Sequence, residues 1–118
     1  MIKVYGAPKI CITCRNFKAI ATNRKLIVED IDIIESTANL KAFLKIRESA
    51  LCFEEVRANN KIGIPCFERE DGTVTCDMNE ALKWMGQPPV KEEEIVEKED
   101  MDCEDCGNIM LHKLNKKD

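Results

Sequence analysis

Within residues 1–23, a strand pattern is followed directly by a helix pattern, and this order constrains the fold of the chain most. In the opening stretch MIKVYG, Ile2 and Val4 occupy alternate positions, a period of two that is typical of a strand with one buried face. From residue 14 to residue 23, Phe17 and Ile20 keep the spacing of one helix face. A strand followed at once by a helix predicts a β-α-β unit with a parallel strand pair.

The next two segments continue this alternation. The stretch 26–34 is short and rich in β-branched residues, so it predicts a second strand that is buried for most of its length. Ser36 or Thr37 can cap a helix over 38–51, whose apolar positions follow a helical period. The stretch 48–61 is less regular and predicts an excursion that contains one short helical turn.

A hairpin is predicted over residues 66–76, because Asp71–Gly72 is a two-residue turn signal between two strand-like runs. A turn of that length pairs Phe67 with Cys76. Side chains alternate between the faces of a strand, so Cys66 and Cys76 would then point to opposite sides of the sheet. This register disfavours a disulfide between them.

The last predicted helix begins at Asp77, which together with Glu80 has the form of a capping box. Glycine and two prolines follow it, so we expect the folded body to end near Gln87. The resulting order, β-α-β-α-β-β-α, predicts an α/β sandwich. We therefore expect one domain over 1–87 and an acidic linker with a cysteine-containing tail over 88–118.

Composition narrows the functional classes. Of the 118 residues, 34% are charged and 44% are hydrophobic, and the sequence contains no apolar run of the roughly 18 residues that span a bilayer. We see no signal peptide and expect a cytoplasmic protein without a membrane partner. There is no basic stripe of the kind that binds nucleic acid, and the net charge of −4 is concentrated in the tail.

Seven cysteines are many for a reducing compartment, and this favours thiol chemistry over structural disulfides. Cys11 and Cys14 form a C-x-x-C pair, with Cys11 at the predicted start of a helix. A helix N-terminus stabilises a thiolate and lowers its pKa from the usual value of about 8.5. Cys11 could therefore attack a disulfide, and Cys14, which we expect to be more buried, could resolve the product. Lys9 and Arg15 are close enough in sequence to add positive potential.

Two other interpretations of this pair remain open. A C-x-x-C pair is also half of a tetrahedral zinc site, and two cysteines can simply be small core residues. The strand before the pair and the helix after it favour the redox interpretation. Cys52, Cys66 and Cys76 are interpreted as packed core residues.

From residue 1 to residue 87, the chain resembles the glutaredoxins, and more closely the glutaredoxin-like (glutaredoxin-related) proteins of bacteria within the thioredoxin fold superfamily. The segments that carry the resemblance are VYGAPKICITC, STANLKAFL, GIPCF, DGTVTCD and EALKWMG. The resemblance implies a four-stranded mixed sheet with helices on both faces and a redox-active disulfide in which Cys11 is the nucleophile and Cys14 is the resolving thiol. It also implies that Pro65 is cis, that the backbone of Ile64 pairs with the substrate, and that Asp77 lies beside a glutathione carboxylate.

The sequence departs from this family in four places. The residues between the cysteines are Ile-Thr rather than Pro-Tyr. Thr75 and Cys76 replace glycines before Asp77, which adds bulk where glutathione would approach. The stretch 48–61 is longer than the usual connection, and an acidic tail follows the domain.

A second pair, Cys103 and Cys106, stands in the sequence CEDCGN, which has the form of a zinc knuckle. One knuckle supplies two of four ligands, and His112 is a candidate third. The alternatives are a tail dithiol that exchanges electrons with Cys11 and Cys14, and bystander thiols. The sequence does not choose among these three.

The sequence thus predicts a cytosolic thiol-disulfide oxidoreductase that acts in electron transport, with Cys11 and Cys14 as catalytic residues and Lys9, Ile64, Pro65 and Asp77 as substrate-binding residues. No cofactor is required, glutathione is a candidate co-substrate, and the partner is a disulfide-containing protein or a small thiol. The alternative function is a zinc-binding interaction module on a thioredoxin-like scaffold that uses Cys103 and Cys106. The oligomeric state is left open.

Overall fold

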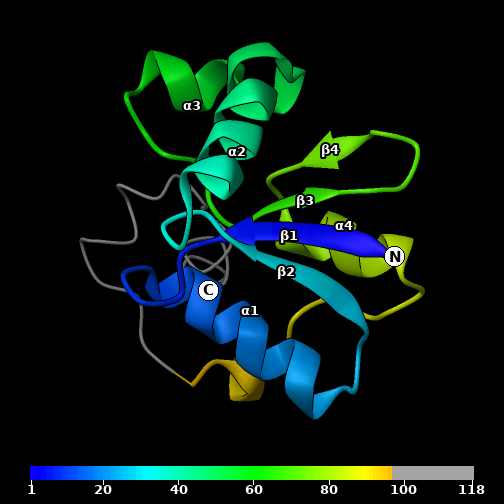
Figure 1. Cartoon of the computed structure of the whole chain (residues 1–118). Helices are drawn as coiled ribbons and strands as arrows, with labels where there is room; N and C mark the ends of the chain where they lie inside the picture. The colour runs from blue at the N-terminus through cyan, green and yellow to red at the C-terminus, as the bar shows by residue number, and fades with distance from the viewer. Residues whose placement is uncertain (97–118) are drawn as a thin grey trace.

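Residues 1–96 are described by the structure, a computed structural model. Four strands, four α-helices and two short 3-10 helices follow one another in this part of the chain (Figure 1). In chain order they are β1 (Ile2–Gly6), α1 (Ile12–Asn23), β2 (Val28–Asp32), α2 (Thr37–Ser49), η1 (Leu51–Phe53), α3 (Glu54–Ala58), β3 (Cys66–Glu68), β4 (Val74–Thr75), α4 (Met78–Trp84) and η2 (Glu92–Glu94). The predicted α/β class and order are confirmed, and the short helical turn predicted within 48–61 is η1 followed by α3.

The strands form one mixed sheet in the order β2-β1-β3-β4. β1 and β2 are parallel, as the crossover helix predicts, whereas β3 is antiparallel to both β1 and β4. β2 lies at the edge, and its residues Glu29 and Asp30 are exposed. The prediction that this strand is mostly buried is therefore wrong, because an edge strand has a neighbour on one side only.

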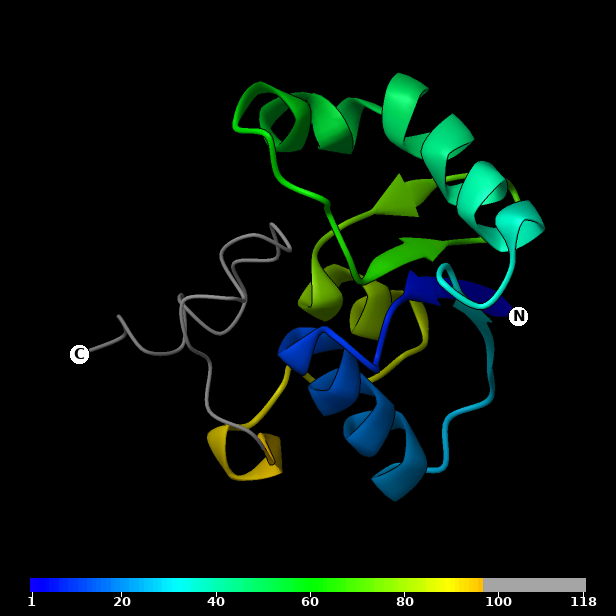
Figure 2. The ribbon, with the colours of Figure 1, turned by 60° about the vertical axis from the view of Figure 1, so that its left-hand side comes forward.

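Helices cover both faces of the sheet: α1 and α4 lie on one face, and α2 and α3 on the other (Figure 2). On the first face Phe17 of α1 meets Phe67 of β3 edge to face, with ring centroids 4.9 Å apart. On the second face Phe43 of α2 packs against Phe53 of η1 at 5.8 Å. Such aromatic pairs add about 0.5–1.5 kcal/mol to the apolar area they bury.

The apolar face predicted for the second helix is only partly correct. Ser36 caps α2 as predicted, by accepting the N–H of Asn39 at 3.1 Å. Phe43 is buried, but the chain turns to an extended conformation at Ala50, with ψ of 138°. Leu51 therefore leaves the helical register and is 80% exposed.

The hairpin has a different register from the predicted one. Phe67 pairs with Thr75, and the Arg69 N–H donates to the Thr73 carbonyl at 2.8 Å, so the loop contains three residues rather than two. Gly72, with φ of +91°, provides the left-handed position that such loops require. In this register Cys66 stands opposite Cys76, and the prediction that they point to opposite sides is wrong.

The cap of α4 also differs in detail. Asp77 is the cap residue, as predicted, and its carboxylate accepts the N–H of Asn79 at 3.0 Å. Glu80 does not close a box on Asp77. It accepts instead from the Thr75 hydroxyl at 2.5 Å, and that hydroxyl accepts the Asp77 N–H at 3.0 Å.

Packing continues beyond Gln87, near which we expected the folded body to end. Val90 is 5% exposed and belongs to the core between α1 and α4. The Val90 N–H donates to the side chain of Asn79 at 2.9 Å, and the Val96 N–H donates to that of Asn16 at 3.0 Å. The expectation that the folded body ends near Gln87 is thus wrong, whereas the division into two domains stays a prediction. Of the helices described in residues 1–96, none combines the length and apolar character needed to cross a bilayer.

Candidate active site

The C-x-x-C pair lies where the sequence predicts it, at the start of α1. The chain leaves β1 and forms a turn in which the Ala7 carbonyl accepts the N–H of Cys11 at 2.9 Å. Cys11 is extended, with φ of −121° and ψ of 115°, and it is the N-cap residue of the helix. Its Sγ accepts the backbone N–H of Cys14 at 3.2 Å. A cysteine sulfur therefore takes the place that a serine or aspartate oxygen usually has at a helix start.

Cys14, one turn along, is held against the end of β1. Its Sγ accepts the backbone N–H of Ala7 at 3.4 Å. A Cβ built on Gly6 would come within 3.0 Å of the same sulfur, closer than carbon normally approaches. Gly6 therefore allows the sulfur to rest directly on the backbone of the strand.

Both cysteines are present as thiols, and both are buried. Cys11 is 1% exposed and Cys14 is 5% exposed, so the expectation that Cys14 is the more buried of the two is wrong. Cys14 lines a cavity of about 230 Å³, whereas Cys11 is not among the described residues that line it. A reactant in this cavity therefore meets the sulfur of Cys14 first.

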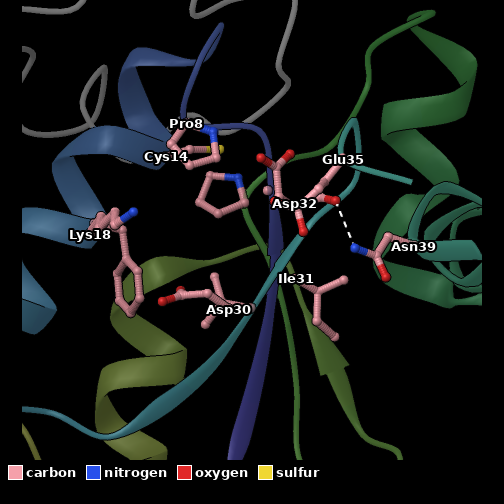
Figure 3. Close-up of a pocket in the computed structure, with 12 residues that line it drawn as sticks. Pro8, Cys14, Lys18, Asp30, Ile31, Asp32, Glu35 and Asn39 are labelled. Carbon is pink, nitrogen blue, oxygen red and sulfur yellow. Dashed lines mark hydrogen bonds between the residues drawn. The ribbon is translucent and has the colours of Figure 1, made fainter. Parts of the chain in front are cut away.

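The cavity lies between α1, the carboxyl ends of the parallel strands β1 and β2, and Pro65 (Figure 3). Pro8 and Pro65 line the cavity together with Cys14, and Asp30, Asp32 and Glu35, from β2 and the turn after it, contribute carboxylates. The Asn39 side chain donates to the Asp32 carbonyl at 3.0 Å, which fixes α2 to the end of β2. The full lining is Val4, Gly6, Pro8, Cys14, Phe17, Lys18, Asp30, Ile31, Asp32, Glu35, Asn39 and Pro65.

Carboxylates outnumber cations in this lining. Three acidic side chains face one ammonium group, that of Lys18. The sequence analysis missed these acidic residues. The available signal was their position, since the carboxyl ends of adjacent parallel strands form the usual ligand crevice of an open α/β sheet.

The predicted substrate-binding residues differ in their position relative to the cavity. Pro65 lines the cavity beside Cys14, and the Ile64–Pro65 peptide bond is cis, as the resemblance implies. Ile64 is 1% exposed and packs in the same core cluster as both cysteines. Lys9 is exposed, and within the described part of the chain neither Lys9 nor Asp77 lines the cavity.

Arg15, the other predicted source of positive potential, binds the backbone of the loop before α1. Its Nη1 donates to the carbonyl of Pro8 at 2.7 Å, which ties the first turn of α1 to the loop before it. This contact holds Pro8 over the cavity. The guanidinium thus helps to shape the site through the backbone.

Three further cysteines were interpreted as core residues. Cys66 is 0% exposed, which confirms the interpretation for this residue. Cys52 and Cys76 are only partly buried, and their sulfurs lie 3.5 Å apart. All five described cysteines belong to or pack against one core cluster.

The predicted zinc residues Cys103, Cys106 and His112 lie outside the described residues. Among residues 1–96, no group of three or more histidine, cysteine, aspartate or glutamate side chains is arranged to hold a metal ion. The zinc interpretation of the tail stays a prediction.

Comparison with known proteins adds one relative. A protein of Haemophilus influenzae, described as an uncharacterized protein, is similar to this chain, with 33% identity over 51 residues. The match covers 43% of this chain and 59% of the relative. No family model and no solved structure matches the chain. Function is therefore argued from the geometry of the site.

Proposed function

We propose that this protein is a thiol-disulfide oxidoreductase of the glutaredoxin type, built on a thioredoxin-like fold, and that Cys11 and Cys14 are its redox pair. The observation that carries the proposal is the placement of both thiols where α1 starts. Backbone N–H groups of Cys14 and Ala7 reach the two sulfurs at 3.2 and 3.4 Å. Pro65 and Cys14 line the same cavity, which supports the proposal.

The chemistry is a two-electron exchange. The Cys11 thiolate attacks one sulfur of a substrate disulfide, a mixed disulfide forms, and one substrate thiolate leaves. Cys14 loses its proton and attacks the Cys11 sulfur, which releases the second substrate thiolate and leaves a Cys11–Cys14 disulfide. Two molecules of a small thiol reductant return the pair to dithiols and are themselves joined as a disulfide.

Cys11 is assigned as the attacking thiol because it caps the helix. An N–H donor and the positive end of a helix both stabilise negative charge on a sulfur. Because Cys11 is buried, attack on a substrate requires the chain around it to open. Cys14 lies one turn along and is placed to resolve the mixed disulfide.

The lining of the cavity supports a substrate class. With three carboxylates and one ammonium, the cavity favours cationic groups beside the sulfur of Cys14. Glutathione carries two carboxylates, so this lining disfavours it. We therefore propose a substrate disulfide flanked by positive charge.

Trapping with variants in which one cysteine is replaced tests the proposal. Purified protein is incubated with cystamine, a small cationic disulfide, and adducts are located by peptide mass spectrometry. Cys14→Ser should accumulate a mixed disulfide on Cys11, because no resolving thiol is present. Cys11→Ser should lose steady-state disulfide reductase activity, and Cys66→Ala is the matched control, expected to retain it.

Two outcomes would contradict the proposal. Full reductase activity in Cys11→Ser would remove the pair from the mechanism. A stable adduct on Cys14 in Cys11→Ser, combined with no adduct in Cys14→Ser, would reverse the assigned roles.

A further inference from the structure

We propose that Cys52 and Cys76 form a second redox site, a dithiol that a small-molecule disulfide converts to an internal disulfide. Cys52 belongs to η1, and Cys76 lies between β4 and α4. This site is separate from the Cys11–Cys14 pair, and the proposal does not depend on the function proposed above.

The geometry of the two sulfurs is the first argument. Their separation is 3.5 Å, and the Cys76 sulfur also lies 3.8 Å from the Cys52 carbonyl oxygen. A disulfide bond is about 2.05 Å long. Closing this gap requires the two sulfurs to approach each other by about 1.5 Å.

Access is the second argument, and it separates Cys52 from Cys66 as the partner of Cys76. Cys66 stands opposite Cys76 in the hairpin and is close enough to influence its titration. Cys66 is however fully buried, whereas Cys52 and Cys76 are both partly exposed. A small disulfide in solution therefore meets Cys52 or Cys76, and the neighbouring sulfur completes the exchange.

The exchange balances without any further reactant. One thiolate of the pair attacks the small disulfide, a mixed disulfide forms, and one small thiol leaves. The second thiol loses its proton and attacks the first sulfur, which releases the other small thiol. Two protein thiols become one disulfide, and one small disulfide becomes two thiols.

Both thiols are held in the protonated form, and this lowers the rate of the exchange. The hydrogen bond with Cys76, together with burial, raises the pKa of Cys52. For Cys76 the hydrogen bond with Cys52 acts to lower the pKa, but the hydrogen bond with Cys66 and burial outweigh it and raise the value to about 12. Because the thiolate is the nucleophile, exchange at this pair is slow at neutral pH.

The position of the pair gives oxidation a structural consequence. Phe53, next to Cys52, packs on Gly63 so closely that a Cβ there would lie 2.4 Å from the Phe53 ring. Gly63 is two residues before Pro65, which lines the active-site cavity. A Cys52–Cys76 disulfide would therefore fix η1 to the end of β4 and hold the segment that carries Pro65.

The test uses the full chain and 2-hydroxyethyl disulfide, an uncharged small disulfide. After incubation, remaining thiols are alkylated in acid and the peptides are mapped by mass spectrometry. We expect a peptide pair linked through Cys52 and Cys76, both in the natural sequence and in Cys11→Ser/Cys14→Ser. The second protein lacks the redox pair of the proposed function, so failure of one proposal is distinguishable from failure of the other.

Matched variants complete the design. Cys66→Ala should still form the Cys52–Cys76 link, whereas Cys52→Ser should carry only a mixed disulfide on Cys76. In the Cys11→Ser/Cys14→Ser background, the oxidised protein should unfold at a higher temperature than its reduced form, and adding Cys52→Ser should abolish this rise. A Cys66–Cys76 link, mixed disulfides with no internal bond, or oxidation that disappears in Cys11→Ser/Cys14→Ser would each overturn the proposal.

Discussion

At the scale of single residues, Gly63 joins the insert formed by η1 and α3 to the segment that leads to Pro65 and the cavity. It has φ of +91°, and a Cβ there would meet the Phe53 ring at 2.4 Å and Val56 at 3.1 Å. Backbone conformation and packing therefore both require glycine at this position. The residue sets how closely the insert can approach the segment that leads to Pro65.

The hairpin glycine Gly72 provides a matched control, because it has the same φ of +91° but nothing within 4 Å of a built Cβ. We expect Gly72→Ala to lower the free energy of unfolding by about 1–2 kcal/mol, the cost of a left-handed alanine. Gly63→Ala should cost a further 1–3 kcal/mol or so, because it also overpacks the core. Urea denaturation of both variants checks this, and equal losses would show that Phe53 does not constrain Gly63.

At the scale of elements, Arg24, the C-cap residue of α1, holds the segment 88–96 beside the helix, in addition to the hydrogen bond between the Val96 N–H and Asn16. Arg24 forms two bonds to the Glu94 carboxylate, of 2.6 and 2.8 Å, and also donates to the carbonyls of Pro88 and Pro89. Both charged side chains are less than a fifth exposed. Solvent therefore screens this pair less than a pair on the open surface.

Replacing this arginine should release the segment. We expect Arg24→Ala to lower the free energy of unfolding by about 2 kcal/mol, the usual range for hydrogen bonds to a charged group. Amide hydrogen exchange of residues 90–96 should accelerate while β1 stays protected. Lys41→Ala, an exposed change on α2, is the control and should alter neither quantity. Unchanged exchange in Arg24→Ala would contradict the assigned role.

The same ion pair predicts a pH dependence. The hydrogen bonds from Arg24 hold the pKa of Glu94 below its ordinary value of 4.5. The depressed folded-state pKa means that this pair stabilises the fold fully above pH 4.5 and loses the contribution as the pH falls through the lower value. The stability difference between the natural protein and Arg24→Ala should therefore shrink below that pH. A difference that stays constant down to pH 3 would contradict the assignment.

The acidic side chains at the carboxyl end of β2 lead to a separate prediction about substrates. We expect reduction of cystamine to be about tenfold faster than reduction of oxidised glutathione at low salt, because acidic side chains face the cavity. Asp30→Asn/Glu35→Gln should reduce this ratio, and so should about 1 M salt, which screens charges beyond about 3 Å. Glu48→Gln, on the exposed side of α2, is the control. If neither the double variant nor the added salt alters this ratio, the proposed electrostatic preference is contradicted.

The sequence predicts local features of this fold well and tertiary context poorly. The strand β1, the start of α1 at Cys11 and the cap at Ser36 depend on neighbouring residues, and their patterns predicted them correctly. The exposure of β2 depends on which strand forms the edge, and that is not a local property. The hairpin register depended on one additional loop residue, and this single step brings Cys66 opposite Cys76.

The candidate site likewise has features that local sequence predicts and features that depend on tertiary packing. The C-x-x-C pair could be placed from the sequence because strand and helix patterns flank it directly. The cavity could not, because its lining combines α1, β2, the start of α2 and Pro65, which lie far apart in the chain. The burial of Cys11 was likewise not predictable, since it depends on packing between elements.

At the scale of the whole molecule, the sheet and its two helical layers bring the five described cysteines to one core cluster. Cys11 and Cys14 lie at the start of α1, while Cys52 and Cys76 lie across the same cluster. The first pair has backbone N–H donors at its sulfurs, and the second has raised pKa values. One molecule would thus hold a reactive pair and a slow pair.

The central claim is that Cys11 and Cys14 form a reversible redox couple. An equilibrium titration in buffers of reduced and oxidised dithiothreitol, followed by acid quenching and peptide mapping, measures it directly. We predict that a Cys11–Cys14 disulfide appears and disappears along one two-electron curve, that Cys66→Ala leaves this curve unchanged, and that the oxidised pair is fully recovered as thiols. If Cys11 and Cys14 stay thiols across the whole range of buffers, or oxidise only by linking separate molecules, the account is contradicted.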